Sequence, residues 1–197
     1  MTGCVNLGVM FLSGDGVPQD TERSLALNVR ACHGGLSTAC GNVGFHMEFG
    51  RGTPRDPDAA VRMFERACRL DALSCGRLAI SHQTGFGSAR ADPKRAEQLF
   101  ERSCQAGVRS GSSISSVSCV AARLLRGDSP RMPHRSLSQI VPVMQPQCDD
   151  DIERACAFVG VAQIGMGRAE QGRALLSHAC SLGDYWACDL VERTKPR

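Results

Sequence analysis

The sequence predicts an all-α fold, an α/α superhelix (solenoid) built from repeats of two helices each. The first observation is the spacing of the 11 cysteines along the 197 residues. Ten of them form close pairs, and the second members of these pairs follow one another after 35, 44, 37 and 32 residues. A period in the thirties is the length of a two-helix repeat. The pairs are Cys32/Cys40, Cys68/Cys75, Cys104/Cys119, Cys148/Cys156 and Cys180/Cys188, and Cys4 stands alone.

Glycines provide the second observation, because they recur in the same register as the cysteines. Gly14 and Gly16 stand ten and twelve residues after Cys4, and the same offsets recur after Cys40 and Cys75. Each unit therefore reads as helix A, a Gly-x-Gly turn and helix B, all within a single solenoid domain covering residues 1–197. The predicted repeats cover residues 1–34, 35–70, 71–107, 108–149 and 150–182, followed by a C-terminal capping helix at 183–197.

Each helix B has a local start signal and an apolar stripe. Asp56 can accept a hydrogen bond from the free N–H groups of a first helical turn, and Pro57 stands where its missing N–H costs nothing. Asp92 and Pro93 repeat this arrangement. The stripe follows at i, i+4, i+7 and i+8, which places its members on one helical face. The members are Ala60, Phe64, Ala67 and Cys68, then Ala96, Phe100, Ser103 and Cys104.

Each helix A has a matching stripe with a small residue at one fixed position. The stripes are Cys4, Leu7, Gly8 and Phe11, then Cys40, Val43, Gly44 and Met47. The fixed position is occupied by Gly8, Gly44, Ala79 and Gly160. Because these residues have little or no side chain, we expect neighbouring helices to approach one another closely there.

The fourth repeat departs from this pattern. Residues 107–118, between Cys104 and Cys119, are rich in Gly and Ser, and we expect them to be flexible and polar. Several prolines follow, so helix B of this repeat should be short or kinked. Two interpretations of Gly107 to Ser118 stay open: a loop that contacts a ligand, or a repeat that has drifted on the surface. The prolines are Pro130, Pro133, Pro142 and Pro146.

Two segments resemble a known family. The run CVNLGVMFLSGDGVPQD (residues 4–20) resembles helix A and the turn of Sel1-like repeats, the bacterial relatives of tetratricopeptide repeats (TPR). The run RMFERACRLDALSCGRLA (residues 62–79) is similar to the family's helix B, bridge and next helix A. The resemblance is to the cysteine-rich branch first described as Helicobacter cysteine-rich proteins. It covers essentially the whole chain and is weakest in the fourth repeat.

The resemblance also implies how the cysteines pair. In the family, each pair forms a disulfide that joins helix B of one repeat to helix A of the next. By that resemblance we expect five bridges, with Cys4 as a free thiol. The expected bridges are Cys32–Cys40, Cys68–Cys75, Cys104–Cys119, Cys148–Cys156 and Cys180–Cys188.

The cysteine spacing itself argues against a metal site. The sequence contains no Cys-x-x-Cys, so we expect neither a metal nor a cofactor. Buried free thiols in a cytosolic protein stay an alternative. Disulfides would indicate an oxidising compartment, which is the periplasm, the cell surface or the medium. No signal-like segment opens the chain and Met1 falls inside a helix A, so we interpret the chain as a fragment or mature portion of a longer exported protein.

Charge and polar motifs predict no catalytic residue. The net charge of +3 is spread along arginine-rich helix faces, so we expect no nucleic acid partner. No stretch approaches the length of a membrane helix, so we expect no membrane span. The acidic run from Asp149 to Asp151 is expected to open helix A of the fifth repeat, where carboxylates are favoured. The five histidines are dispersed and form no His-Glu-x-x-His motif: His33, His46, His82, His134 and His178.

These observations predict a non-catalytic, monomeric interaction module that binds a protein or peptide on the concave surface of the solenoid. The alternative is a weak β-lactam-binding or β-lactam-hydrolysing protein, which only the family resemblance suggests. Serine chemistry of that kind uses Ser-x-x-Lys or Lys-Thr-Gly, and neither Lys94 nor Lys195 has a serine three residues before it. A third hypothesis, a mitochondrial intermembrane-space assembly factor of the same family, requires a eukaryotic source.

Overall fold

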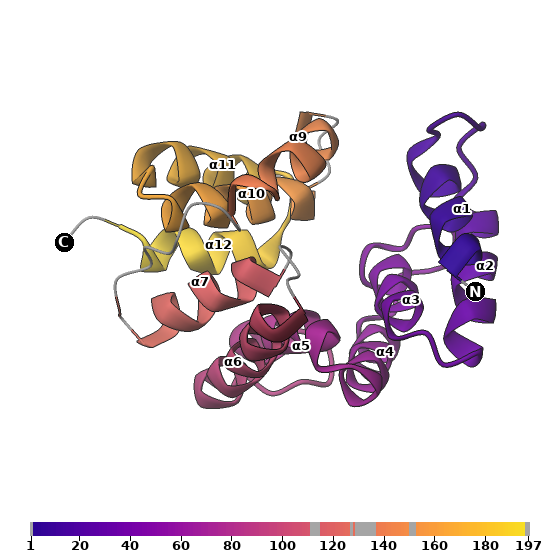
Figure 1. Ribbon diagram of the computed structural model, residues 1–197, viewed down its shortest axis with the longest axis horizontal. Coiled ribbons are helices and arrows are strands. Elements are labelled where there is room, and N and C mark those ends of the chain that lie inside the picture. Colours follow the sequence, from indigo (N-terminus) through magenta and orange to yellow (C-terminus); the bar gives the residue numbers. More distant parts are fainter. Residues whose placement is uncertain (1, 111–114, 127, 129–136, 150–152, 196–197) are drawn as a thin grey trace. The chain divides into compact units, whose positions relative to one another are not determined.

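The computed structural model describes residues 2–110, 115–126, 128, 137–149 and 153–195, and all regular structure within these ranges is helical (Figure 1). The chain divides into two compact units, Met1–Ala91 and Asp92–Arg197. We describe each unit by itself. The predicted repeat boundaries and the single solenoid domain stay predictions.

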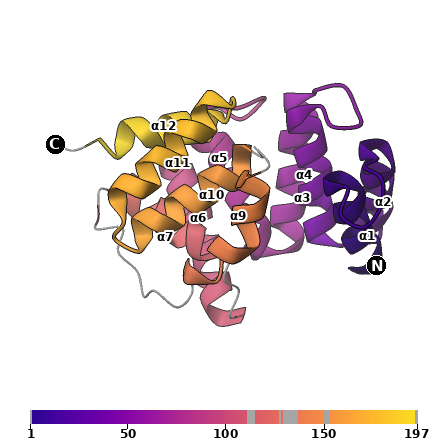
Figure 2. The same cartoon turned by 90° about the horizontal axis from the view of Figure 1, so that it is seen from above.

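Unit 1 contains five α-helices and one short 3-10 helix. The A helices are α1 (Thr2–Ser13), α3 (Ser37–Phe49) and α5 (Cys75–Thr84), and the B helices are α2 (Thr21–His33) and α4 (Pro57–Leu70). The 3-10 helix η1 (Ala72–Ser74) leads directly into α5. Each helix packs against the next one along the chain (Figures 1 and 2). The A and B helices thus alternate as the periodic stripes predict.

Aspartates cap both B helices of unit 1, and Asp56 of α4 is one that the sequence predicted. The Asp56 side chain accepts a hydrogen bond from the Ala59 N–H at 2.9 Å, and Pro57 is the first residue of α4. Asp20 caps α2 in the same way, accepting from the Arg23 N–H at 2.9 Å. Each cap satisfies a backbone donor that has no partner inside its helix.

The Gly-x-Gly turns use their two glycines for different purposes. Gly50 ends α3 with φ of 70°, a left-handed conformation that closes the helix without a Cβ penalty. Gly52 also has a positive φ, 69°, and a Cβ there would collide with the backbone of Thr21 at the start of α2. The first glycine therefore turns the chain, and the second lets the turn contact helix B of the preceding repeat.

The small residue within each helix A allows the expected close approach. A Cβ added at Gly44 would overlap the Phe64 ring of α4 and would lie 3.1 Å from the Ala60 carbonyl oxygen. At Gly8 the same atom would lie 2.8 Å from the Asn28 amide nitrogen of α2. The prediction of close helix packing at these positions is confirmed.

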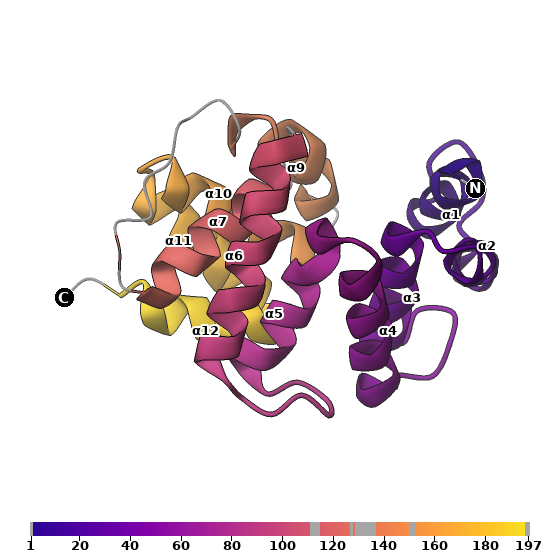
Figure 3. The ribbon, with the colours of Figure 1, turned by 60° about the horizontal axis from the view of Figure 1, so that its bottom comes forward.

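Unit 2 contains six helices in its described residues. They are α6 (Pro93–Ser110), α7 (Ser115–Arg126), α9 (Val141–Asp149), α10 (Glu153–Gly165), α11 (Ala169–Ser181) and α12 (Tyr185–Arg193) (Figure 3). Trp186 of α12 is completely buried. Its ring centroid lies 6.3 Å from that of Phe100 on α6 and 5.8 Å from that of Phe158 on α10. These three rings form the aromatic centre of the unit.

The irregular fourth repeat differs from its prediction in two places. Residues 107–110 belong to the end of α6 and residues 115–118 to the start of α7, so only 111–114, outside the described residues, separate the helices. Helix growth past Cys104 adds a backbone hydrogen bond per residue, and no proline stops it. Asp149 ends α9 and does not open the next helix A, which begins at Glu153. The predicted short helix B is α9, nine residues long with Pro146 inside it; Pro130 and Pro133 lie outside the described residues.

Candidate functional site

Five disulfides join successive helices of the structure. The S–S distances lie between 1.94 and 2.06 Å, and each bridge links one α-helix to the following α-helix. Disulfides persist in oxidising surroundings, so these bridges indicate such an environment. The bonded pairs are Cys32–Cys40, Cys68–Cys75, Cys104–Cys119, Cys148–Cys156 and Cys180–Cys188. Cys4 on α1 is a free, partly buried thiol.

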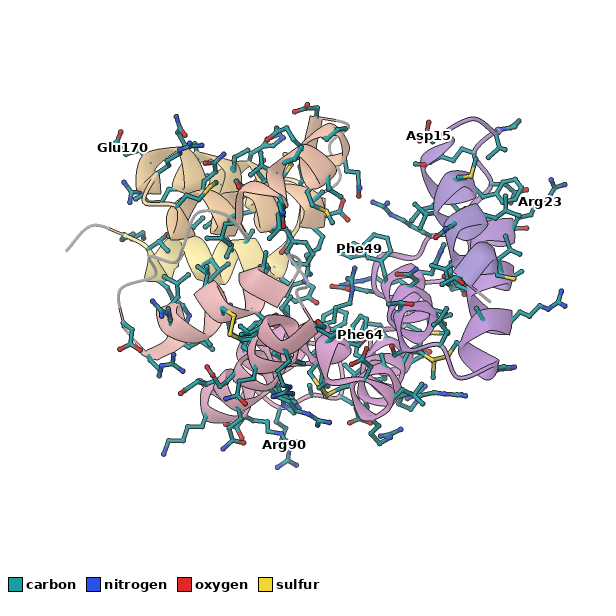
Figure 4. All side chains as sticks on the ribbon, in the orientation of Figure 1. Asp15, Arg23, Phe49, Phe64, Arg90 and Glu170 are labelled. Atoms are coloured by element: carbon teal, nitrogen blue, oxygen red, sulfur yellow. A yellow bond between two sulfur atoms is a disulfide. The ribbon has the colours of Figure 1, made fainter. Side chains whose placement is uncertain are left out.

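A cluster of arginine and phenylalanine side chains lies on α3, the turn after it and α5. Phe45 and Phe49 stand one turn apart on α3, with ring centroids 4.9 Å apart. The Arg51 guanidinium carbon is 5.0 Å from the Phe45 centroid and 5.7 Å from that of Phe49. Arg77 on α5 also places its guanidinium carbon 5.0 Å from the Phe45 centroid. We call these four residues the Arg–Phe cluster; Phe49 is labelled in Figure 4.

Helix positions and the turn together build this cluster. Phe45 and Phe49 are four residues apart, so they share one face of α3. Arg51 is the middle residue of the Gly50-Arg51-Gly52 turn, which returns over that face. Cations within about 6 Å of an aromatic centroid gain about 0.5–2 kcal/mol, depending on desolvation. Each guanidinium is therefore held against the rings.

A buried carboxylate completes the local electrostatics. The Glu48 side chain is 1% exposed, and its Oε2 lies 3.6 Å from Nη1 of Arg77. The Arg55 Nε donates to the Glu48 carbonyl oxygen at 3.0 Å. Glu48 thus contacts an arginine through its carboxylate and another through its backbone carbonyl. Arginine beside aromatic rings is a combination that can bind a ligand with a carboxylate and apolar groups.

His46, on the same helix, belongs to a buried polar chain between α2 and α3. Its Nδ1 is 2.7 Å from the Arg51 carbonyl oxygen, which can only accept, so Nδ1 carries the proton. Its Nε2 then accepts from the Ser24 hydroxyl at 3.0 Å. The chain continues through Asn28 Nδ2, which donates to the Ser24 carbonyl at 2.9 Å, and Asn42 Nδ2, which donates to Asn28 Oδ1 at 3.1 Å. This chain fixes the turn that carries Arg51.

Burial lowers the pKa of His46, and the nearby charge of Arg51 lowers it further. The hydrogen bond to the Arg51 carbonyl works in the opposite direction and raises the pKa, but burial is the largest effect. The neutral ring is therefore the favoured form in the folded protein. Its role is to position the turn, since both ring nitrogens already have partners.

The sequence predicted neither the Arg–Phe cluster nor the buried polar chain that contains His46. His46 belongs to no His-Glu-x-x-His motif, and its register position, six residues after the leading cysteine, holds Met10 in the first repeat. The spacing of Phe45 and Phe49 with an arginine in the turn was the available signal for the cluster. His33 and His178 lie in the last turns of α2 and α11. His134 lies outside the described residues.

The described residues offer neither a metal-binding cluster nor a membrane-spanning helix. They contain no group of three or more His, Cys, Asp or Glu side chains that could hold a metal ion. No helix among them is both long enough and apolar enough to cross a membrane.

Comparison with known proteins identifies the repeats. Residues 2–36, 37–71 and 72–108 each match the Sel1 repeat, so the chain belongs to the Sel1 repeat family. No curated protein sequence matches the chain. It is similar to the crystal structure of a Sel1 repeat protein from Oxalobacter formigenes, with a TM-score of 0.54 and 21% identity over 94% of this chain and 74% of that one.

A second solved structure shares the fold. It is a protective antigen present in uropathogenic Escherichia coli strains and displaying an SLR fold, with a TM-score of 0.52 and 20% identity. The match covers 96% of this chain and 40% of the antigen chain. At these identities the likeness shows the fold alone. The chain is thus a disulfide-linked Sel1 repeat scaffold, a class that generally mediates protein interactions.

Proposed function

We propose that this chain is a non-catalytic protein- or peptide-binding scaffold of an exported bacterial protein, and that it acts as a monomer. Stacked helix pairs form an extended concave surface along their A helices. The Arg–Phe cluster lies on the A helices α3 and α5 and the turn after α3, and it would be part of that surface. The observation that carries the proposal is the pair of guanidinium groups held 5.0 Å from one phenylalanine ring.

The chemistry of the cluster suits binding. Arginine and aromatic side chains are enriched at protein interfaces and supply most residues whose truncation strongly weakens binding. Here the rings restrict the arginines before a ligand arrives, so less side-chain entropy is lost on binding. Arginine also binds a carboxylate through two parallel hydrogen bonds. A peptide segment with an acidic residue beside an apolar one is therefore the expected ligand.

Selection from a displayed peptide library, followed by affinity measurement on the selected peptides, tests this proposal. We expect acidic and apolar residues to be enriched, and we expect Arg51→Ala and Phe49→Ala each to weaken binding at least tenfold. Arg23→Ala is the matched control, because Arg23 also lies over a phenylalanine, Phe11 at 5.7 Å, but outside the cluster. Equal affinity for the cluster variants and the wild type would remove the cluster from the binding surface. Nothing in the described residues favours the β-lactam alternative, which stays a hypothesis that nitrocefin turnover would test.

The disulfides support the exported location. Protein isolated from its native compartment and alkylated without a reductant should be labelled on one thiol, that of Cys4. After reduction, labelling should reach all 11 cysteines. Intact-mass spectrometry distinguishes the two states. Extensive labelling before reduction would contradict both the bridges and export.

A further inference from the structure

The backbone carbonyl of Arg51 links the Arg–Phe cluster to a buried histidine. The Arg51 side chain belongs to the cluster, and its carbonyl oxygen lies 2.7 Å from Nδ1 of His46. The His46 side chain is 1% exposed, and electrostatic effects are stronger where water is excluded. One residue therefore connects the cluster to a group that can gain a proton near neutral pH.

The protonated form of His46 would keep both of its hydrogen-bond partners. In the neutral ring, Nδ1 donates to the Arg51 carbonyl and Nε2 accepts from the Ser24 hydroxyl of α2, 3.0 Å away. A gained proton goes to Nε2, which then becomes a donor. A hydroxyl can accept as well as donate, so a rotation of the Ser24 O–H bond satisfies the charged ring. The turn after α3 therefore stays attached to His46 in both protonation states.

Protonation strengthens the hydrogen bond that holds this turn. A hydrogen bond from a charged donor is about twice as strong as one between neutral groups. Burial lowers the pKa of His46 most, the hydrogen bond to the Arg51 carbonyl raises it, and the charge of Arg51 lowers it. The carbonyl and the guanidinium of one residue thus act in opposite directions on the same proton.

A negatively charged ligand at Arg51 would change this balance. Its charge would offset the charge of the guanidinium, which opposes protonation of His46, while the hydrogen bond to the carbonyl would remain. Protonation of His46 would then cost less in the complex than in the unbound protein. Because such coupling is reciprocal, the protonated ring increases the affinity for the anion by the same factor.

The other charged groups around α3 have different partners or face solvent. The structure packs α2, α4 and η1 against α3. Ion pairs join Glu48 to Arg77, Asp20 to Arg23 and Glu65 to Arg69, while Arg66 donates to the Cys32 carbonyl and Asp71 caps η1. The exposed ones are Glu22, Arg30 and His33 on α2, Arg55 in the turn, and Asp58 and Arg62 on α4. After burial, Arg51 is the residue through which the pKa of His46 is shifted.

We infer that an acidic ligand at Arg51 and a proton on His46 bind cooperatively, so that the Arg–Phe cluster holds acidic ligands more tightly at mildly acid pH than at neutral pH. This inference rests on the proposed function of the cluster. It makes the buried chain of Ser24 and His46 a pH-sensitive regulator of that site. A ligand without negative charge gains no such advantage.

The probe is a capped peptide, acetyl-Ser-X-Phe-Leu-Ser-amide, in which X is cysteic acid. Its sulfonate keeps a full negative charge between pH 8 and 5, so a change of affinity arises in the protein. Isothermal titration calorimetry with the full-length chain should give a Kd about fivefold smaller at pH 5 than at pH 8. The same peptide with glutamine at X should show no such change.

Nuclear magnetic resonance of the His46 ring gives the reciprocal measurement and needs no variant. The ring signals of the wild-type chain are followed against pH, with and without a saturating amount of the sulfonate peptide. Because the peptide offsets the charge of Arg51, we expect it to raise the pKa of His46. The glutamine peptide should leave that pKa where it is.

Two histidine variants make the affinity measurement specific. His46→Asn keeps an N–H donor for the Arg51 carbonyl but has no proton to gain, so its affinity for the sulfonate peptide should be the same at both pH values. His82→Asn is the matched control, because Nδ1 of His82 lies 3.3 Å from the carbonyl oxygen of Arg90, an arginine outside the cluster that is labelled in Figure 4. This control should keep the full pH dependence.

The outcomes separate this inference from the proposed function. Binding that Arg51→Ala weakens but that does not change with pH would overturn the inference and leave the proposed function standing. An unchanged pKa of His46 in the saturated complex, or a pH dependence that survives His46→Asn, would do the same. Absence of binding, or binding that survives Arg51→Ala, would overturn the proposed function and the inference with it.

Discussion

The two units of this chain stabilise similar helix pairs with different residues. Unit 1 depends on regular repeat features: aspartate caps, left-handed glycines after α3 and α5, and bridges with sequence separations of 8 and 7. In unit 2 the first bridge spans 15 residues and α9 contains a proline. The matches to the Sel1 repeat end at residue 108, soon after unit 2 begins.

Unit 2 has core interactions that unit 1 does not show at equivalent positions. Arg154 of α10 and Asp184, the N-cap of α12, form an ion pair with Nε 2.6 Å from Oδ2, and the side chains are 3% and 0% exposed. The Arg154 guanidinium also lies 5.1 Å from the Tyr185 ring. Together with the buried Trp186, these contacts lie between α10 and the start of α12. A solenoid can therefore lose its repeat signature when individual buried contacts hold neighbouring helices instead.

Breaking the buried ion pair should have the largest effect. Arg154→Ala leaves the Asp184 carboxylate buried without its guanidinium, and removal of one partner from a buried pair costs about 3–5 kcal/mol. We expect the free energy of unfolding of unit 2 to fall by this amount. Urea denaturation followed by the fluorescence of Trp186, the chain's one tryptophan, measures it.

Arg126→Ala is the control for this experiment. Arg126 contacts three carboxylates, those of Glu97, Glu101 and Asp128, but its side chain is 34% exposed. Exposed ion pairs contribute about 0–1 kcal/mol, so the fluorescence midpoint should move little. Similar small effects of both substitutions would mean that aromatic packing alone holds α12.

Removal of a bridge from each unit should have the next largest effect. In the chain-entropy model, the Cys68–Cys75 bridge contributes about 2.5 kcal/mol and the longer Cys104–Cys119 loop about 3 kcal/mol. We expect the double alanine variants to lose these amounts, measured by circular dichroism for unit 1 and by Trp186 fluorescence for unit 2. If the losses of the two variants differ by more than about 2 kcal/mol, the loop closed by Cys104–Cys119 has strain or structure that the chain-entropy model omits.

The sequence predicted the regular parts of the molecule better than the irregular ones. Asp56 and Gly50 act through the backbone next to them, so their effect could be read from local sequence. The end of α6 could not, because Gly107 and Ser110 favour a loop locally and adopt a helix in the tertiary structure. The close approach at Gly44 was predictable because the small residue recurs at the same register position.

The candidate site was less predictable than the fold. The Arg–Phe cluster brings Arg77 to Phe45 across more than 30 residues of sequence, and only the folded arrangement of α3, α4 and α5 creates that contact. The Arg154–Asp184 pair likewise joins two residues that are 30 positions apart in the sequence, one on α10 and one at the N-cap of α12. Periodicity shows that such helices are stacked, but it does not show which polar side chains meet.

A glycine substitution tests the regular packing of unit 1 directly. Gly44→Ala would place a methyl group into the Phe64 ring, and overpacking of this kind costs about 1–3 kcal/mol. Gly41→Ala in the same helix is the control, because a Cβ there meets nothing within 4 Å. It should stabilise the helix by about 0.5–1 kcal/mol through helix propensity. Urea denaturation followed by circular dichroism should show a lower free energy of unfolding for Gly44→Ala and a higher one for Gly41→Ala. Equal changes in the two variants would refute the close-contact explanation.

The smallest expected effect is a pH dependence confined to unit 1. The pKa of His46 is lowered in the folded state from its ordinary value of 6.5. As the pH falls through 6.5, the unfolded chain therefore binds a proton before the folded chain does, and stability decreases until the pH lies below the folded-state pKa. The equivalent residue of unit 2, Ala162, cannot titrate. We expect the urea midpoint of unit 1, measured by circular dichroism, to decrease as the pH is lowered from 8 to 5. The His46→Gln substitution should remove most of this decrease. The exposed His33→Gln control should keep it, and an unchanged fall in His46→Gln would assign the pH dependence to another group.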